Sequence, residues 1–283
     1  MDWSKAKNIL IIAFIITNFI LGYVLFTTER VVDATLKEEF IDEAIRLLNN
    51  KNITLATEIP RISPKLNGII VEYETINSDE LNDSFFSNNG DVSKSREENL
   101  AEVVYDKEIL TIINRKLLIY ESGKTEKKYD LKDEKQAVSV ALRFLEERNY
   151  DTKDMKLSYI KEHKGTYYIE FSKVYDNVYL ESAFTNIIVD NTGIKRLERT
   201  WLNVRDTGEI PIYISSAPKA ILGLLDKKDA YGRVIKDISL CYYFDPEKHE
   251  YIEMPSEAKQ GKAIPAWRVQ FEDGYKIFLD SYY

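Results

Sequence analysis

Residues 1–26 have the sequence MDWSKAKNILIIAFIITNFILGYVLF, and this stretch constrains where the rest of the chain can lie. Residues 9–26 carry no charged side chain, and their only polar side chains are those of Thr17, Asn18 and Tyr23. A helix of this length covers about 27 Å, close to the roughly 30 Å of a bilayer's hydrocarbon core. The pattern predicts a transmembrane helix over residues 9–26.

Two other interpretations of residues 9–26 fit the sequence less well. A helix in the core of a soluble protein usually keeps a polar stripe, and this run shows none at helical spacing. A cleaved signal peptide has a shorter apolar region that ends at a small-x-small site, whereas this run ends at Leu25 and Phe26. We therefore expect an uncleaved signal anchor.

The residues that flank the span predict its orientation. Lys5 and Lys7 precede it and Arg30 follows it, so the basic residues favour a cytoplasmic N-terminus. Residues 1–8 are then cytoplasmic, and the C-terminal domain is extracellular. We expect a single-pass protein of the cell membrane.

The bulk composition fits a folded extracellular region. The chain has 283 residues, a net charge of −8 and 44% hydrophobic residues, enough to bury a core. The acidic balance argues against nucleic acid as a partner. Cys241 is the only cysteine, so no intramolecular disulfide can form. Nineteen tyrosines and twelve phenylalanines favour β structure.

After the span, a helix followed by antiparallel strands recurs three times, which is typical of an α+β fold with helices on one face of each sheet. Residues 27–128 should hold a stalk helix, in which Thr35 and Glu38 could form a capping box, and a first α+β unit. Residues 129–283 should hold two further helix-plus-sheet units. Helices are expected over 31–50, 133–148 and from Ser216 onward, and strands over 68–75, 101–105, 116–120, 155–163, 167–171, 184–189, 194–204 and 238–244, with a hairpin over 267–279 that turns at Gly274.

Residues 77–99 are rich in Ser, Asn, Asp and Glu, which predicts a long mobile loop. Phe85 and Phe86 interrupt this polar stretch. Two interpretations stay open. The rings could hold the loop to the core, or they could form an extracellular contact with a partner.

The sequence offers little support for catalysis. His163 and His249 have no metal-ligand neighbours at helical or hairpin spacing, so we expect no metal site and no cofactor. Cys241 lies in an apolar strand, where a buried thiol is the usual outcome. Glu170 and Glu181 could flank a cleft as a glycosidase pair does, but so could many other carboxylates. We expect no catalytic residues and no enzyme.

Three segments resemble the YycI family of membrane-anchored regulatory proteins of Gram-positive bacteria. The first is the opening Met1-Asp2-Trp3-Ser4-Lys5 before an Ile-rich span. The second is the central run 168–203, with its Asn-Thr-Gly turn and Trp201. The third is Tyr242-Tyr243 followed by residues 265–269, Pro-Ala-Trp-Arg-Val, and a last aromatic strand. The third segment also resembles PepSY-like modules. Residues 51–125 match no pattern of the family.

The resemblance implies a non-catalytic regulator. Proteins of the YycI family act with a YycH-like companion on the sensor histidine kinase of the WalK/WalR (YycG/YycF) cell-wall two-component system, through membrane-helix and extracellular contacts. It also implies a PepSY/YycH-like fold for the extracellular region.

The span itself provides residues that could contact a partner helix. The amide of Asn18 is costly to expose to hydrocarbon, and a partner helix could satisfy it. Ala13 with Thr17, and Asn18 with Gly22, are small or polar residues four apart, which permits close helix approach. The alternative is that Asn18 bonds within its own helix.

Two other functions stay open. A PepSY-type module could inhibit a secreted peptidase or bind a cell-wall ligand, with the anchor serving only to localise it. An anchored wall hydrolase would need a carboxylate pair in a deep cleft.

Overall fold

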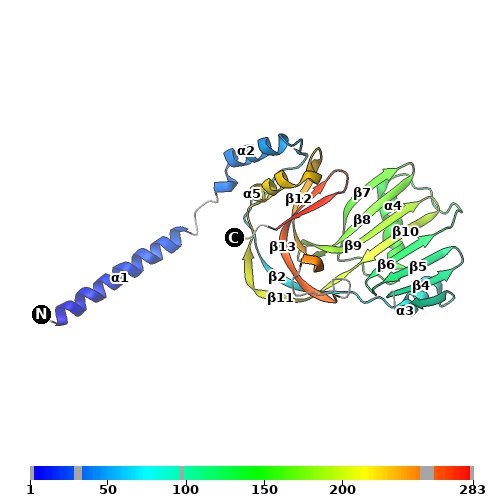
Figure 1. Ribbon diagram of the computed structural model, residues 1–283, viewed down its shortest axis with the longest axis horizontal. Coiled ribbons are helices and arrows are strands. Elements are labelled where there is room, and N and C mark those ends of the chain that lie inside the picture. The colour runs from blue at the N-terminus through cyan, green and yellow to red at the C-terminus, as the bar shows by residue number, and fades with distance from the viewer. Residues whose placement is uncertain (1–2, 29–33, 96–98, 249–257, 281–283) are drawn as a thin grey trace.

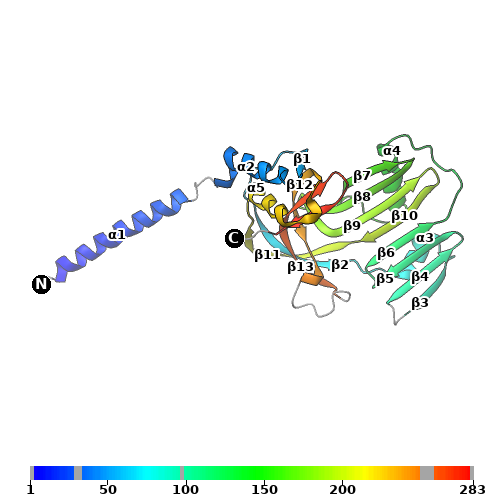
Figure 2. The ribbon, with the colours of Figure 1, turned by 45° about the horizontal axis from the view of Figure 1, so that its top comes forward.

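The computed structural model describes residues 3–28, 34–95, 99–248 and 258–280, and within the first helix it describes the side chains of residues 7, 8 and 10–23. That helix, α1 (Trp3–Thr28), projects away from the folded body in both ribbon views (Figures 1 and 2). Its described side chains are exposed, and Phe19 is 80% accessible. A helix over residues 9–26 is therefore confirmed, whereas its crossing of a membrane stays a prediction. Among the described residues, no helix is both long enough and apolar enough to cross a membrane.

Fourteen strands of the described chain join into one hydrogen-bonded sheet. Its main path is β11-β2-β13-β12-β9-β10-β6-β5-β4-β3, with β7 and β8 branching from β9, β14 beside β13, and β1 beside β12. The strands are β1 (Thr54–Leu55), β2 (Lys65–Tyr73), β3 (Asp91–Ser95), β4 (Leu100–Tyr105), β5 (Glu108–Ile113), β6 (Leu117–Ser122), β7 (Met155–His163), β8 (Thr166–Tyr175), β9 (Val178–Asp190), β10 (Gly193–Thr200), β11 (Leu202–Tyr213), β12 (Val234–Tyr243), β13 (Gln260–Phe271) and β14 (Lys276–Leu279).

A parallel pairing of β12 with β9 connects the two halves of this sheet. Cys241 of β12 lies opposite Tyr179 of β9, and Tyr243 lies opposite Glu181. The prediction of one antiparallel sheet for each helix-plus-sheet unit is therefore wrong. The units share a single sheet because β9 extends past its hairpin with β10 and offers a free stretch to β12.

The buried side chains divide the chain differently from the predicted units 27–128 and 129–283. One core contains residues 81–120 together with 137–197, so a boundary at residue 128 would cut through it. A second core joins residues 41–59 to residues 214–279, and a third lies among β2, β9, β11, β12 and β13. The helix that follows α1 packs against the C-terminal third of the chain. Residues 41–59 therefore belong to a different core from the residues that follow them in sequence.

Helix α4 (Glu134–Glu146) confirms the prediction over 133–148. The Asp133 side chain accepts a hydrogen bond from the backbone N–H of Gln136, which caps the helix as its sequence predicts. Ala137, Ala141 and Leu145 are buried against the sheet. The apolar residues whose spacing predicts an amphipathic helix are therefore the residues that pack against the sheet.

The helices at the other end of the molecule depart from the prediction. Helix α2 spans Glu38–Asn49 after the 3₁₀ turn η1 (Ala34–Leu36), and residues 31–33 of the predicted stalk helix lie outside the described residues. The N-cap is Lys37, so Thr35 and Glu38 form no capping box, and the Thr35 hydroxyl contacts Ser216 instead. The helix expected from Ser216 is short. It comprises α5 (Ala217–Ala220) and continues as 3₁₀ turns η2 (Ile221–Asp226) and η3 (Lys228–Ala230), with a further turn η4 at Pro246–Lys248.

The prediction of a mobile loop over 77–99 is wrong for the residues described. Helix α3 (Ser78–Phe86) begins after Asn77, whose side chain accepts a hydrogen bond from the N–H of Asp79, and it ends at Ser87 in the left-handed conformation. Strand β3 follows and pairs with β4. Asn82 fixes the connection, since its amide bonds both the N–H and the C=O of Gly90. The polar residues of this segment cap a helix and connect elements. A mobile loop has the same composition, so composition alone does not distinguish the two.

The C-terminal hairpin is confirmed in detail. Trp267 lies opposite Leu279 and Val269 opposite Ile277. Gly274 turns the chain with φ of +88°, a conformation that favours glycine. The Trp267 ring is buried in the core that contains α5 and η2, and its Nε1–H donates to the carbonyl of Ser215 at 2.8 Å.

Candidate functional site

The predicted membrane-contact residues lie on α1. The Thr17 hydroxyl donates to the carbonyl of Ala13 and the Asn18 amide donates to the carbonyl of Phe14, each at 2.9 Å. The alternative in which Asn18 bonds within its own helix therefore describes this structure. A Cβ atom on Gly22 would meet no described atom within 4 Å, so this face of α1 is open. Contact with a partner helix stays a prediction.

Phe85 and Phe86 lie inside the folded body. Phe86 is buried with 5% exposure, and Phe85 packs against Tyr120 and Phe144. The rings hold α3 to the core, which matches the first of the two interpretations. An extracellular partner contact through Phe86 would require this packing to open, because its ring is already covered.

Glu170 and Glu181 do come together, as a glycosidase pair would, but Lys276 lies between them. Its Nζ contacts both carboxylates. Glu181 also accepts a hydrogen bond from the fully buried guanidinium of Arg268 at 2.7 Å. The ammonium group therefore occupies the space where a glycosidic bond would have to lie.

Arg268 extends this buried network across the sheet. Its guanidinium donates to Asp237 of β12 at 2.7 Å and to Gln270 at 2.6 Å, in addition to Glu181 of β9. These contacts cross the parallel junction between β9 and β12. The network therefore holds together the two halves of the sheet.

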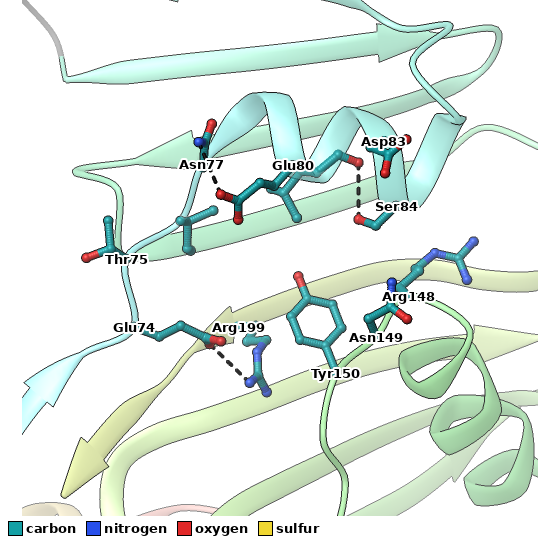
Figure 3. A pocket seen from close by; sticks show the side chains of 12 residues that line it. Glu74, Thr75, Asn77, Glu80, Asp83, Ser84, Arg148, Asn149, Tyr150 and Arg199 are labelled. Carbon is teal, nitrogen blue, oxygen red and sulfur yellow. Dashed lines mark hydrogen bonds and ion pairs between the residues drawn. The ribbon is translucent and has the colours of Figure 1, made fainter.

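A pocket of about 330 Å³ beside α3 gathers charged side chains from distant parts of the chain. Three parts of the chain form it: the segment after β2, helix α3, and the turn that follows α4 together with β10. Figure 3 shows α3 along one wall, with Tyr150 pointing toward it and the guanidinium of Arg199 turned away from it toward Glu74. The lining residues are Glu74, Thr75, Ile76, Asn77, Glu80, Leu81, Asp83, Ser84, Arg148, Asn149, Tyr150 and Arg199.

Arg199 is the most deeply buried charge of the pocket, with 3% exposure. Its guanidinium donates to the hydroxyl of Thr185 at 2.9 Å and to the carboxylate of Glu74 at 3.1 Å. It also lies 4.6 Å from the centre of the Tyr150 ring, within cation–π range. Its Nε has no hydrogen-bond partner among the described residues.

Arg148 approaches the pocket from the end of α4. Its guanidinium stacks 3.5 Å from the centre of the Phe144 ring and donates to the carbonyl of the same residue. Burial lowers the pKa of Arg148 and raises the pKa of Tyr150. The Nε of Arg148 also has no partner within the described part of the chain.

The opposite wall is acidic. Glu80 and Asp83 both lie on α3, exposed to solvent on the pocket side (Figure 3). The amide of Asn77 donates to Glu80 at 3.4 Å and that of Asn88 donates to Asp83 at 2.6 Å. The pocket therefore presents carboxylates on the α3 side, and on the other side Arg148 together with the Arg199–Glu74 ion pair.

No sequence motif marked this pocket. Arg148 appeared only as the end of a predicted helix, and Tyr150 and Arg199 were not singled out. Arg199 meets Glu74 across 125 positions of sequence, so local pattern gives no sign of their pairing. The acidic composition of 77–99 was visible, but it was interpreted as a loop.

The remaining candidates from the sequence are two histidines and one cysteine. His163 ends β7, and His249 lies outside the described residues. Within the described ranges, no three His, Cys, Asp or Glu side chains are positioned to hold a metal ion. Cys241 is fully buried, and burial raises the pKa of its thiol.

The shared sheet and its helices can be compared with known proteins. No family model matches the sequence, and no curated protein sequence matches it. Among solved structures, YycH from Bacillus subtilis matches with a TM-score of 0.52 and 15% identity, over 78% of this chain. The fold is similar to that of YycH. The match spans about half of YycH, 53% of its chain.

Two further structures match. An uncharacterized protein from Eubacterium rectale has a TM-score of 0.52 and 13% identity, over 85% of this chain and 94% of its own. The YpeB C-terminal domain of Bacillus megaterium covers 74% of this chain and 94% of its own, at 10% identity, but its TM-score of 0.42 is too low to infer a shared fold. The YycH match supports the α+β, YycH-like fold that the family resemblance implied.

Proposed function

We propose that the protein is a membrane-anchored, non-catalytic regulator of a cell-wall sensor histidine kinase of the WalK type, acting with a YycH-like companion. The observation that carries the proposal is the similarity to the YycH fold over 78% of the chain. The YycI-like segments at the start, centre and end of the sequence point to the same regulatory system.

The proposal places α1 in the cell membrane with the N-terminus in the cytoplasm and the C-terminal domain outside. Residues 9–26 carry no charge, and the described side chains of α1 face away from the folded body. The helix therefore has no apolar partner within the described chain, while lipid would cover its side chains. A reporter fused after Tyr283 should be active only in an extracytoplasmic assay.

The contacts with the kinase would run partly through α1. The Asn18 amide already bonds to Phe14, so its loss should weaken helix association only modestly. Interhelical hydrogen bonds in membranes average about 0.6 kcal/mol, which corresponds to roughly threefold in affinity. Gly22→Leu adds bulk to an open face and should separate two packed helices further.

The test measures output of the kinase's target genes in cells that carry the wild-type protein, no protein, or the Asn18→Leu/Gly22→Leu variant. Leu10→Ile, which changes neither charge nor polarity of α1, is the control. Regulation should change on deletion, change part-way with the double variant and stay normal with the control. Unchanged output on deletion would contradict the proposal. Normal regulation by the double variant would move the contact from α1 to the extracellular surface.

A further inference from the structure

The pocket beside α3 has a size and a charge distribution that the regulatory proposal does not use. Its volume of about 330 Å³ falls at the lower end of the range for small-molecule sites, which is about 300 to 1,000 Å³. Carboxylates of Glu80 and Asp83 lie on the α3 wall, and Arg148 lies on the other wall with Arg199 and the Glu74 carboxylate that pairs with Arg199.

The two arginines keep hydrogen-bonding capacity after their protein contacts are made. A guanidinium has five N–H donors. Arg199 donates hydrogen bonds to Thr185 and Glu74, and Arg148 donates one to the Phe144 carbonyl. The carboxylate that pairs with Arg148 is that of Glu147, 3.8 Å away and mostly exposed. Buried cations with spare donors are the groups that a ligand carboxylate uses best.

The carboxylates of α3 are similarly available. Glu80 accepts a long contact of 3.4 Å from Asn77, and Asp83 accepts one bond from Asn88. An ionised carboxylate offers about four lone-pair positions, so both can accept further donors. Ile76 and Leu81 supply apolar surface between the charged groups.

We propose that this pocket binds a small zwitterion of the amino-acid class. The ligand's carboxylate faces Arg148 and Arg199, its ammonium group faces Glu80 and Asp83, and its aliphatic part contacts Ile76 and Leu81. A purely anionic ligand would meet the acidic wall unfavourably, and a purely cationic ligand would meet the arginines. Only a molecule with both charges is complementary to both walls. Binding requires neither kinase nor membrane, so it stands or fails apart from the regulatory function.

The first experiment is isothermal titration calorimetry of the full-length protein in detergent micelles with three probes. Leucine carries both charges, 4-methylpentanoate lacks the ammonium group and 3-methylbutylamine lacks the carboxylate. Each missing exposed ion pair should weaken binding by up to about fivefold. Leucine should therefore bind more tightly than either analogue, by up to about fivefold. Equal binding of leucine and 4-methylpentanoate, or no binding of leucine, would overturn the proposal.

The second experiment changes the acidic wall. The Glu80→Gln/Asp83→Asn variant should bind leucine more weakly, by up to about fivefold, and should lose most of the discrimination between leucine and 4-methylpentanoate. Glu39→Gln, the same change on an exposed position of α2, is the matched control and should bind as the wild type does. Circular dichroism melting checks that both variants fold. A folded double variant with wild-type leucine affinity would contradict the assignment, and the probe comparison on the wild type tests it independently if that variant does not fold.

Discussion

Trp267 makes two contacts that a smaller side chain cannot keep. Its ring is buried with 1% exposure, and its Nε1–H donates to the Ser215 carbonyl. Trp267→Ala should therefore lower the free energy of unfolding by about 3–5 kcal/mol, measured by urea denaturation. Trp267→Phe keeps most of the ring and loses the hydrogen bond, so its cost should be smaller. Equal stability of the Ala variant and the wild type would mean that the ring is not part of the core.

Tyr120 predicts a loss of stability in alkali. Burial, and then the hydrogen bond from its hydroxyl to Glu108, raise the pKa of Tyr120 above its ordinary value of 10.0. Above pH 10 the unfolded chain releases this proton while the folded protein still holds it, so stability is full below pH 10 and falls as the pH rises further.

The measurement is urea denaturation of wild type and Tyr120→Phe at pH 8 and at pH 10.5. The variant lacks the ionising hydroxyl, so its stability should fall less between the two pH values. Tyr168→Phe, which changes an exposed tyrosine, is the control and should behave as the wild type does. A Tyr120→Phe variant with the full alkaline loss would show that other groups cause it.

Single residues differ in how far the sequence predicts them. Trp267 could be placed because alternation on both sides of Gly274 assigns it to the apolar face of the hairpin. The other face of β13, with Arg268 and Gln270, is buried as well and was not predicted. Arg199 could not, because Thr185 and Glu74 reach it from other strands. Phe86 was ambiguous because an apolar residue in a polar stretch has the same appearance in a pinned segment and in a binding tip.

At the scale of elements, Asn82 holds α3 to β3. Its buried amide bonds both backbone groups of Gly90, at 2.9 and 3.1 Å. Asn82→Ala leaves these groups unpaired and should cost about 2 kcal/mol of stability. Hydrogen exchange should rise in residues 87–95 more than in α4. Asn88→Ala, which removes an exposed bond to Asp83, should change both quantities much less. Unchanged exchange in the Asn82 variant would mean that the connection is held by other contacts.

Elements with a clear periodic pattern of apolar residues were predictable from the sequence. Elements whose bounds depend on contacts with distant strands were not. The α4 cap and stripe, the β9–β10 turn and the last hairpin each follow from local chemistry. Helix α3 was missed because its polar residues serve as caps and links, and β5 because the two short turns that bound it, at 106–107 and 114–115, contain no glycine. The predicted strand 194–204 divides at Trp201, since β10 pairs with β9 and β6 whereas β11 pairs with β2.

At the scale of the whole molecule, Arg268 joins the two halves of the sheet. It bonds Glu181 on β9 and Asp237 on β12 from a fully buried position. Arg268→Met leaves the buried Glu181 with Lys276 alone and should cost about 3–5 kcal/mol in urea denaturation. Arg268→Met/Glu181→Met removes both charges and should recover part of that loss. A single variant as stable as the wild type would show that the network does not hold the junction.

The joining of distant segments explains why the units could not be predicted. The core that contains α2 is completed by residues 214–279, and the parallel pairing of β9 with β12 spans more than fifty residues of sequence. Neither contact produces a periodic pattern in the sequence. The α+β class, by contrast, follows from local periods alone, and it is confirmed.

Co-purification of the intact protein from cross-linked membranes is the most direct test of the proposal that it regulates a sensor histidine kinase. A C-terminal affinity tag lies away from α1, so it should not disturb contacts within the membrane. The sensor histidine kinase and the YycH-like companion should both be enriched over a control that carries the tag on an unrelated single-pass protein. Recovery of neither protein above that control would contradict the regulatory function.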